Sequence, residues 1–191
     1  MIDDIIVIDN VIPQQYQDAV ETGIFRGNFP WWYQSDSAFL NLKNNTQQYP
    51  SFNQQLAKNG VASNRSFSFI KPIAYFACDK IGFKIQEFVY VKSCLQVPLI
   101  MPSDDRSNNP HVDLTFPHLV CLYYANNSDG ETLIYDIKVT NNDTIYEKST
   151  LTVKKTIKPK KGRAVLFNGQ LLHNSTTPLK SPRCIVNFDL V

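Results

Sequence analysis

The chain has 191 residues, of which 43% are hydrophobic and 12% aromatic, so we expect one globular domain over residues 1–191 rather than a disordered chain. Its formal net charge of +2 is too small to indicate a nucleic-acid partner by itself. The four cysteines lie far apart without a C-x-x-C motif, and the N-terminus lacks the basic start and long apolar segment of a signal peptide. We therefore expect a cytoplasmic protein with reduced thiols and no membrane-spanning segment.

The N-terminal part of the chain predicts helices. A short apolar run, Ile5–Ile8, precedes Pro13, a residue well suited to the first turn of a helix. Apolar residues then recur at helical spacing, which predicts an amphipathic helix over Pro13–Phe25. The same spacing predicts a second helix over Pro72–Phe83.

Between these helices, the Gly27–Asn64 region has an irregular pattern with clusters of Asn and Gln. Its aromatic residues Trp31, Trp32 and Tyr33 are candidates for substrate binding, because loops often carry function. Packing of these aromatics at the edge of the core is the preferred interpretation. The sequence therefore leaves the role of this region open.

The C-terminal half predicts strands. Runs of apolar and β-branched residues separated by turn signals predict strands over Phe88–Val91, Cys94–Met101, Leu119–Tyr124, Glu131–Ile137, Ile145–Val153, Arg163–Phe167, Gln170–Asn174 and Ile185–Val191. Gly162 predicts a turn, and Asn168-Gly169 predicts a two-residue hairpin. Helices followed by many short strands indicate an α+β, mainly β fold, a β-sandwich or double-sheet jelly roll supported by N-terminal helices.

The chain contains three histidines, and two of them belong to a candidate metal site. His111 and Asp113 are two residues apart, so on an extended backbone both side chains lie on the same side. His173 follows sixty residues after Asp113 and is the candidate third ligand. Two imidazoles and one carboxylate suit Fe(II) and leave coordination positions open.

In its C-terminal half, from about Val89 onward, the sequence resembles the 2-oxoglutarate- and Fe(II)-dependent dioxygenases, in particular their prolyl 4-hydroxylase-like branch. The elements that carry the resemblance occur in the family's order: His111-Val112-Asp113, Leu122-Tyr123-Tyr124-Ala125-Asn126, Gly130-Glu131-Thr132, Pro159-Lys160-Lys161-Gly162-Arg163-Ala164-Val165-Leu166-Phe167, His173 and Arg183. The resemblance implies a double-stranded β-helix, also called a jelly roll or cupin-like fold.

The resemblance also implies roles for individual residues. His111, Asp113 and His173 would hold Fe(II), with 2-oxoglutarate and O2 as cosubstrates. Arg183 would form a bidentate pair with the distal carboxylate of 2-oxoglutarate, and Tyr124 and Thr132 match positions that hydrogen-bond the cosubstrate. No catalytic residue beyond the metal ligands is implied.

Strand alternation adds a further candidate, because it places Arg183, Ile185 and Asn187 on one face. If that face points inward, Asn187 also lines the pocket and Tyr123 packs on the side opposite Tyr124. Thr132 as an ordinary strand residue remains an alternative to the cosubstrate contact.

Two positions depart from the family pattern. Met101 stands where many relatives have a Tyr, so the cosubstrate contact on that side is in doubt. Asp189 stands where the nucleic-acid-repair branch has a second Arg, so demethylation of DNA or RNA is not expected. Of the remaining residues, we interpret His118 as a hydrogen-bonded histidine at a strand edge and the basic run Lys154–Arg163 as a solvated turn.

We therefore expect a dioxygenase that hydroxylates an aliphatic C–H bond, with a prolyl or other side chain of a peptide or protein as one substrate class. A free amino acid or other small metabolite is the alternative within the enzyme class. A cupin-like binding module without catalysis is the alternative outside it. The sequence identifies neither the substrate nor the oligomeric state.

Overall fold

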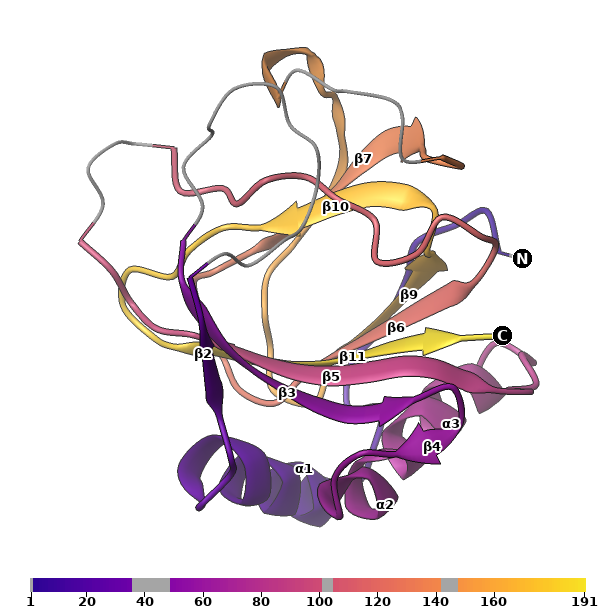
Figure 1. Cartoon of the computed structure of the whole chain (residues 1–191), viewed down its shortest axis with the longest axis vertical. Coiled ribbons are helices and arrows are strands. Elements are labelled where there is room, and N and C mark those ends of the chain that lie inside the picture. Colours follow the sequence, from indigo (N-terminus) through magenta and orange to yellow (C-terminus); the bar gives the residue numbers. More distant parts are fainter. Residues whose placement is uncertain (1, 36–48, 101–104, 142–147) are drawn as a thin grey trace.

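The computed structural model describes residues 2–35, 49–100, 105–141 and 148–191. Its strands form two antiparallel sheets, with the helices beneath the larger one (Figure 1). The larger sheet has the strand order β1-β9-β6-β11-β5-β3-β2, and β4 pairs with β3. The smaller sheet has the order β10-β7-β8.

The strands of the larger sheet are β1 (Ile6–Ile8), β2 (Trp32–Gln34), β3 (Ser51–Lys58), β4 (Val61–Ala62), β5 (Phe88–Gln96), β6 (Leu119–Tyr124), β9 (Ala164–Asn168) and β11 (Arg183–Leu190). Those of the smaller sheet are β7 (Thr132–Lys138), β8 (Val153–Ile157) and β10 (Leu171–Ser175). The α+β, mainly β architecture is thus confirmed, with a jelly-roll-like pair of sheets.

The helices cover the outer face of the larger sheet. They are α1 (Gln14–Val20), which continues as a π-helical segment over Glu21–Arg26, α2 (Ser66–Ile70) and α3 (Pro72–Asp79). Pro72 stands at the first turn of α3, where its missing N–H costs no helical hydrogen bond. The buried residues of α3, Ile73, Ala74, Ala77 and Cys78, follow helical spacing and belong to the largest core cluster. In the described ranges, no helix combines the length and hydropathy needed to cross a bilayer.

Alternation along the strands divides the core into two parts. In β11, Cys184, Val186, Phe188 and Leu190 join the helix-side cluster, whereas Ile185 joins a second cluster between the two sheets. In β6, Tyr123 belongs to the helix-side cluster and Tyr124 to the one between the sheets. The period of two therefore directs every second side chain of both strands toward the space between the sheets, where the candidate site lies.

Several sequence predictions need correction. In its described residues, 27–35 and 49–64, the Gly27–Asn64 region contains β2, β3 and β4, which its Asn- and Gln-rich pattern did not indicate, because β3 is held by pairing with β5 rather than by an alternating apolar face. The predicted strand Ile145–Val153 is wrong over its described residues, since Lys148–Thr150 form a 3-10 turn and β8 begins only at Val153.

The predicted hairpin at Asn168-Gly169 is also wrong. Its flanking strands β9 and β10 belong to different sheets, with β9 paired to β6 and β10 to β7. The turn therefore carries the chain from one layer to the other. By contrast, the turn at Gly162 is present, with a positive φ of 77°.

Candidate active site

His111 and His173 are held side by side through their backbones. They form an isolated antiparallel bridge, in which His111 N donates to His173 O at 2.8 Å and His173 N donates to His111 O at 2.9 Å. The segment that carries His111 is otherwise irregular, and Val112 turns away into a small apolar cluster with Leu172. The expected same-side placement of His111 and Asp113 thus arises from one bridge to β10 rather than from a strand of their own.

Backbone carbonyls fix the orientation of both imidazoles. Nδ1 of His111 lies 3.1 Å from Asn109 O, and Nδ1 of His173 lies 2.9 Å from Leu171 O. A carbonyl oxygen can only accept, so each Nδ1 carries the proton and each Nε2 keeps a lone pair for a ligand. Burial, reinforced by His173, lowers the pKa of His111 to about 4, so its imidazole is neutral near pH 7.

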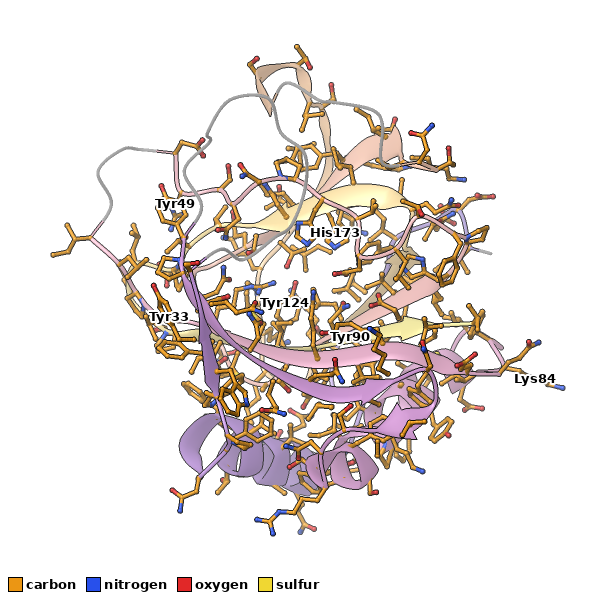
Figure 2. The ribbon with its side chains drawn as sticks, viewed as in Figure 1. Tyr33, Tyr49, Lys84, Tyr90, Tyr124 and His173 are labelled. Atoms are coloured by element: carbon orange, nitrogen blue, oxygen red, sulfur yellow. The ribbon has the colours of Figure 1, made fainter. Side chains whose placement is uncertain are left out.

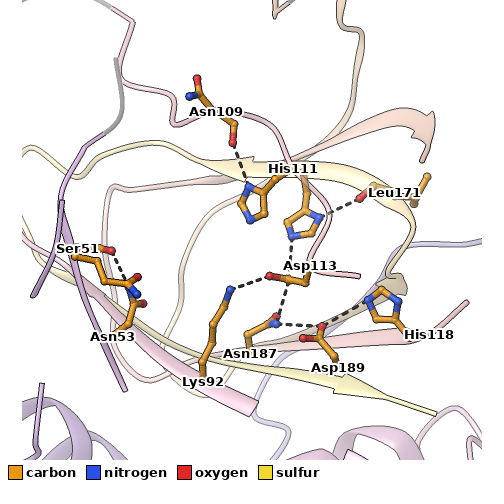
Figure 3. A network of polar contacts seen from close by, with 12 residues as sticks. Ser51, Asn53, Lys92, Asn109, His111, Asp113, His118, Leu171, Asn187 and Asp189 are labelled. Atoms are coloured by element: carbon orange, nitrogen blue, oxygen red, sulfur yellow. Dashed lines mark hydrogen bonds and ion pairs between the residues drawn. The ribbon is translucent and has the colours of Figure 1, made fainter. Parts of the chain in front are cut away.

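Asp113 completes the cluster, and both its carboxylate oxygens are held by neighbouring side chains (Figure 3). Lys92 Nζ donates to Oδ1 at 2.8 Å, and Asn187 Nδ2 donates to Oδ2 at 3.1 Å. Burial alone would raise the pKa of Asp113, but the positive charge of Lys92 holds it well below the usual value. The same pairing raises the pKa of Lys92 against the opposing effect of burial.

The three side chains fit a metal ion. Their candidate ligand atoms all lie within 4.8 Å of one another, and His173 Nε2 is 3.5 Å from Asp113 Oδ2. Two imidazoles and one carboxylate on one side of an ion form the donor set typical of non-haem Fe(II) sites. In such sites each metal-binding side chain also makes a hydrogen bond on its side away from the metal, and this bond fixes its orientation.

A guanidinium group lies in the same cavity. Arg183 begins β11, and its side chain is only 4% exposed. Nη2 donates to Thr132 Oγ1 at 2.7 Å, Nη1 donates to Gln96 Oε1 at 3.3 Å, and Nε has no hydrogen-bond partner among the described residues. No Asp or Glu of the described ranges pairs with this cation. A buried charge without a counterion is costly, so this part of the cavity favours an anionic ligand.

Tyr124 and Thr132 stand beside Arg183. Tyr124 Oη donates to Thr132 Oγ1 at 2.7 Å, and the guanidinium lies 5.7 Å from the Tyr124 ring centroid. Because Thr132 accepts from both Tyr124 and Arg183, its own hydroxyl proton remains for an acceptor inside the cavity. Gly130 makes room for this arrangement, since a Cβ there would lie 2.8 Å from Thr176 O and 3.2 Å from Arg183 Cδ.

Thr132, Arg183 and the three candidate metal ligands share one hollow between the sheets. His173 lines this space, whereas Tyr124, labelled with it in Figure 2, is buried in the apolar cluster between the sheets and is not among the lining residues. The hollow is lined by the three candidate metal ligands and by residues that include Lys92, Cys94, Gln96, Asn108, Thr132, Arg183, Ile185 and Asn187. The predicted inward face of Arg183, Ile185 and Asn187 is therefore the face that lines the cavity.

Asn187 lines the cavity, as expected from strand alternation, and also contacts the candidate metal ligand Asp113. Its amide nitrogen donates to Asp113 Oδ2 and, at 3.2 Å, to Asp189 Oδ1. Asp189 in turn lies 3.6 Å from Nε2 of His118, and both side chains are fully buried. His118 Nδ1 contacts Phe116 O at 2.8 Å. Asp189, at the position of the repair branch's second Arg, thus belongs to a buried polar chain that ends on Asp113 (Figure 3).

Other sequence candidates lie elsewhere. Trp31 is half-buried and packs against Phe29, with the two rings tilted and their centroids 4.7 Å apart. Trp32 and Tyr33 are 69% and 64% exposed on the edge strand β2, and Tyr33 lies at the rim in Figure 2. None of the three is among the residues that line the cavity. Met101 lies outside the described residues.

Sequence reasoning missed Lys92 and Gln96. Both belong to β5, where Lys92, Cys94 and Gln96 alternate with residues of the opposite face. The spacing K-x-C-x-Q in a predicted strand was the available signal, but only the pairing of β5 with β11 shows which face is inward.

Comparison with known proteins gives matches through structure alone. No family model matches the sequence, and no curated protein matches it. Among solved structures, the chain is similar to the non-haem α-ketoglutarate-dependent epimerase SnoN from nogalamycin biosynthesis, with 12% identity, 99% of this chain and 78% of that chain covered, and a TM-score of 0.64.

Two further solved structures have the same arrangement. One is an oxidoreductase of the 2OG-Fe(II) oxygenase family from Burkholderia pseudomallei, with 10% identity, coverage of 97% and 84%, and a TM-score of 0.61. The other is a prolyl hydroxylase from Trichoplax adhaerens in complex with a hypoxia-inducible-factor peptide, with 12% identity, coverage of 97% and 82%, and a TM-score of 0.57. The chain therefore has the double-stranded β-helix fold of the 2-oxoglutarate- and Fe(II)-dependent oxygenases, prolyl hydroxylases among them.

Proposed function

We propose that this protein is an Fe(II)- and 2-oxoglutarate-dependent dioxygenase that hydroxylates an aliphatic C–H bond. The observation that carries the proposal is the buried Arg183 guanidinium, which has no acidic partner in the described ranges and shares a cavity with His111, Asp113 and His173. A dicarboxylate that ligates the metal at one end and pairs with Arg183 at the other satisfies both groups at once.

The residues that line the cavity would have different roles in this reaction. His111, Asp113 and His173 would hold Fe(II), which together with 2-oxoglutarate and O2 supplies the oxidising chemistry when bound. Overall, the substrate C–H, 2-oxoglutarate and O2 become the alcohol, succinate and CO2. Arg183 would bind the distal carboxylate through its planar fork, and Thr132 would donate its free proton to the same group.

The surrounding residues position and shield the reaction. Gln96 and Tyr124 hold the Arg183 side chain in the cavity, which reduces the conformational entropy that binding would otherwise cost. Phe167 packs on His173 with ring centroids 5.2 Å apart and limits access of water from that side. No side chain needs to act as an acid or base for this chemistry.

The substrate is a peptide or a small molecule. A prolyl hydroxylase with a bound peptide and an epimerase from nogalamycin biosynthesis both have this fold. The exposed Trp32 and Tyr33 lie away from the cavity lining, so they do not by themselves favour a peptide.

The experiment that tests the proposal is succinate formation. Purified protein supplied with Fe(II), 2-oxoglutarate and O2 should release succinate slowly even without substrate, and Asp113→Ala should abolish this release. Protein that binds metal but neither binds nor consumes 2-oxoglutarate would instead support a non-catalytic cupin-like module.

A further inference from the structure

Lys92 is a cation in the cavity that the proposed chemistry does not use. It comes from β5, on the same face as Cys94 and Gln96. Its Nζ bonds Asp113 Oδ1 at 2.8 Å, and its side chain remains 25% exposed. An ammonium group has three N–H donors. Asp113 is its hydrogen-bond acceptor in the described part of the chain, so two donors remain for a ligand.

Lys92 and Arg183 stand at opposite ends of the cavity. In the register of β5 with β11, Gln96 pairs with Arg183 and Lys92 pairs with Asn187. Four residues of antiparallel strand separate the two positions on β5, which is about 13 Å. A 2-oxoglutarate held by Arg183 therefore leaves Lys92 at the other end of the cavity, beside Asp113.

The charges of the filled site do not cancel without a further anion. Among the described residues that line the cavity, Arg183 and Lys92 are positive and Asp113 is negative. A divalent metal and dianionic 2-oxoglutarate neutralise each other, so one positive charge remains. The buried His118–Asp189 pair lies behind Asn187, and neither of its side chains lines the cavity.

The positive charge that is not neutralised lies at Lys92. Arg183 is matched by the distal carboxylate of the cosubstrate, whereas Asp113 would be shared between the metal and Lys92. In a partly desolvated cavity an ammonium that lacks a full counterion favours an anion over a neutral group.

Building on the proposed function, we propose that Lys92 binds a carboxylate of the substrate and so selects acidic substrates for hydroxylation. The shared chemistry is a single carboxylate a few bonds from the reacting carbon. It can come from a free amino acid or other small acid, or from an Asp or Glu side chain of a peptide.

Fluorine NMR on protein loaded with Mn(II) and saturating 2-oxoglutarate tests this selection. The probes are trifluoroacetate and its neutral analogue trifluoroacetamide, whose signals broaden when they bind near the paramagnetic ion. In the wild-type protein we expect trifluoroacetate to bind about 10–100-fold more tightly than the amide, the value of one charge-assisted hydrogen bond. Equal affinity for the two probes would overturn the proposal without reference to any variant.

Three variants localise the effect. Lys92→Met should lower trifluoroacetate affinity to that of the amide, and Lys92→Arg should retain the preference. Lys84→Met is the matched control, because Lys84 lies at the far end of the molecule in Figure 2 and should leave both affinities unchanged. A Lys92→Met protein that keeps the acid preference within twofold would also overturn the proposal.

Competition identifies the source of the carboxylate. Displacement of the bound probe by free amino acids indicates a small acid, and displacement by end-blocked peptides containing Asp or Glu indicates a peptide. Failure of this proposal is distinguishable from failure of the proposed function: in the former, 2-oxoglutarate still binds the Mn(II) protein without an acid preference, whereas in the latter it does not bind.

Discussion

Replacement of Arg183 by Met tests the cosubstrate site most sharply. The substitution removes the charge and the planar donor group but keeps an unbranched side chain of similar length. A bidentate pair contains two charge-assisted hydrogen bonds of about 1.5–3 kcal/mol each. Their loss should weaken 2-oxoglutarate binding by about 10²- to 10⁴-fold, at about 1.4 kcal/mol for each factor of ten.

A thermal shift in the presence of Mn(II) measures this loss. At a 2-oxoglutarate concentration 100 times the wild-type Kd, binding should stabilise the wild-type protein by about 2.7 kcal/mol. For a chain of this size that is a rise in Tm of about 5–11 °C. A 100-fold weaker variant gains only about 0.4 kcal/mol at the same concentration, a rise of about 1–2 °C.

The control is Arg163→Met. Arg163 is an arginine near the start of β9 whose Nε bonds Asp9 Oδ1 at 2.7 Å outside the cavity. This variant should have a lower Tm without ligand but keep the full 2-oxoglutarate shift. The reasoning is refuted if Arg183→Met keeps the wild-type shift, because the guanidinium would then not contact the cosubstrate.

Three further predictions concern other parts of the structure. Asn187→Leu removes a hydrogen bond to Asp113 Oδ2 and should weaken Mn(II) binding about 10- to 100-fold by calorimetry; unchanged affinity would show that Asn187 does not orient the ligand. Gly130→Ala introduces a Cβ 2.8 Å from Thr176 O and should lower the free energy of unfolding in urea by about 1–3 kcal/mol, whereas a neutral effect would mean that the loop relaxes freely. Hydrogen bonding to Arg163, followed by Lys160, lowers the pKa of Asp9 from 3.8 to about 2, so the stabilisation of the wild-type protein over Asp9→Asn should be complete above about pH 5 and disappear as the pH falls toward 2. A stability difference that grows on acidification would have the wrong sign.

The group formed by His111, Asp113 and His173 could be proposed from the sequence because two of its members are close in the chain. His111 and Asp113 lie two residues apart, and the chain has one histidine, His118, besides His111 and His173. Their backbone, however, is a single bridge to His173 rather than a strand. The structure brings together the three side chains that the sequence suggested, but the local backbone that presents them was not predicted.

Residues that depend on register could not be predicted in the same way. Lys92 and Gln96 face the cavity because β5 pairs with β11 in one register, and a shift by one residue would turn both toward the helices. The turn at Asn168-Gly169 has the composition of a hairpin, but its flanking strands find their partners in different sheets. Both features are set by contacts between distant parts of the chain, which local patterns do not contain.

Strand β3 is a further element that the local sequence pattern did not predict. Its sequence, Ser51–Lys58, is rich in Asn and Gln and carries no alternating apolar pattern. Pairing with β5 on one side and β2 on the other supplies the backbone hydrogen bonds that hold it. Polar composition therefore indicated a loop where the structure has an inner strand of the larger sheet.

The most direct measurement of the central claim is calorimetric titration of 2-oxoglutarate into the protein with and without Mn(II). We predict one molecule bound per chain only when the metal is present, and no binding to His173→Ala under the same conditions. Equal binding without metal, or no binding to the metal-loaded wild-type protein, would contradict the assignment of His111, Asp113, His173 and Arg183 to one iron and 2-oxoglutarate site.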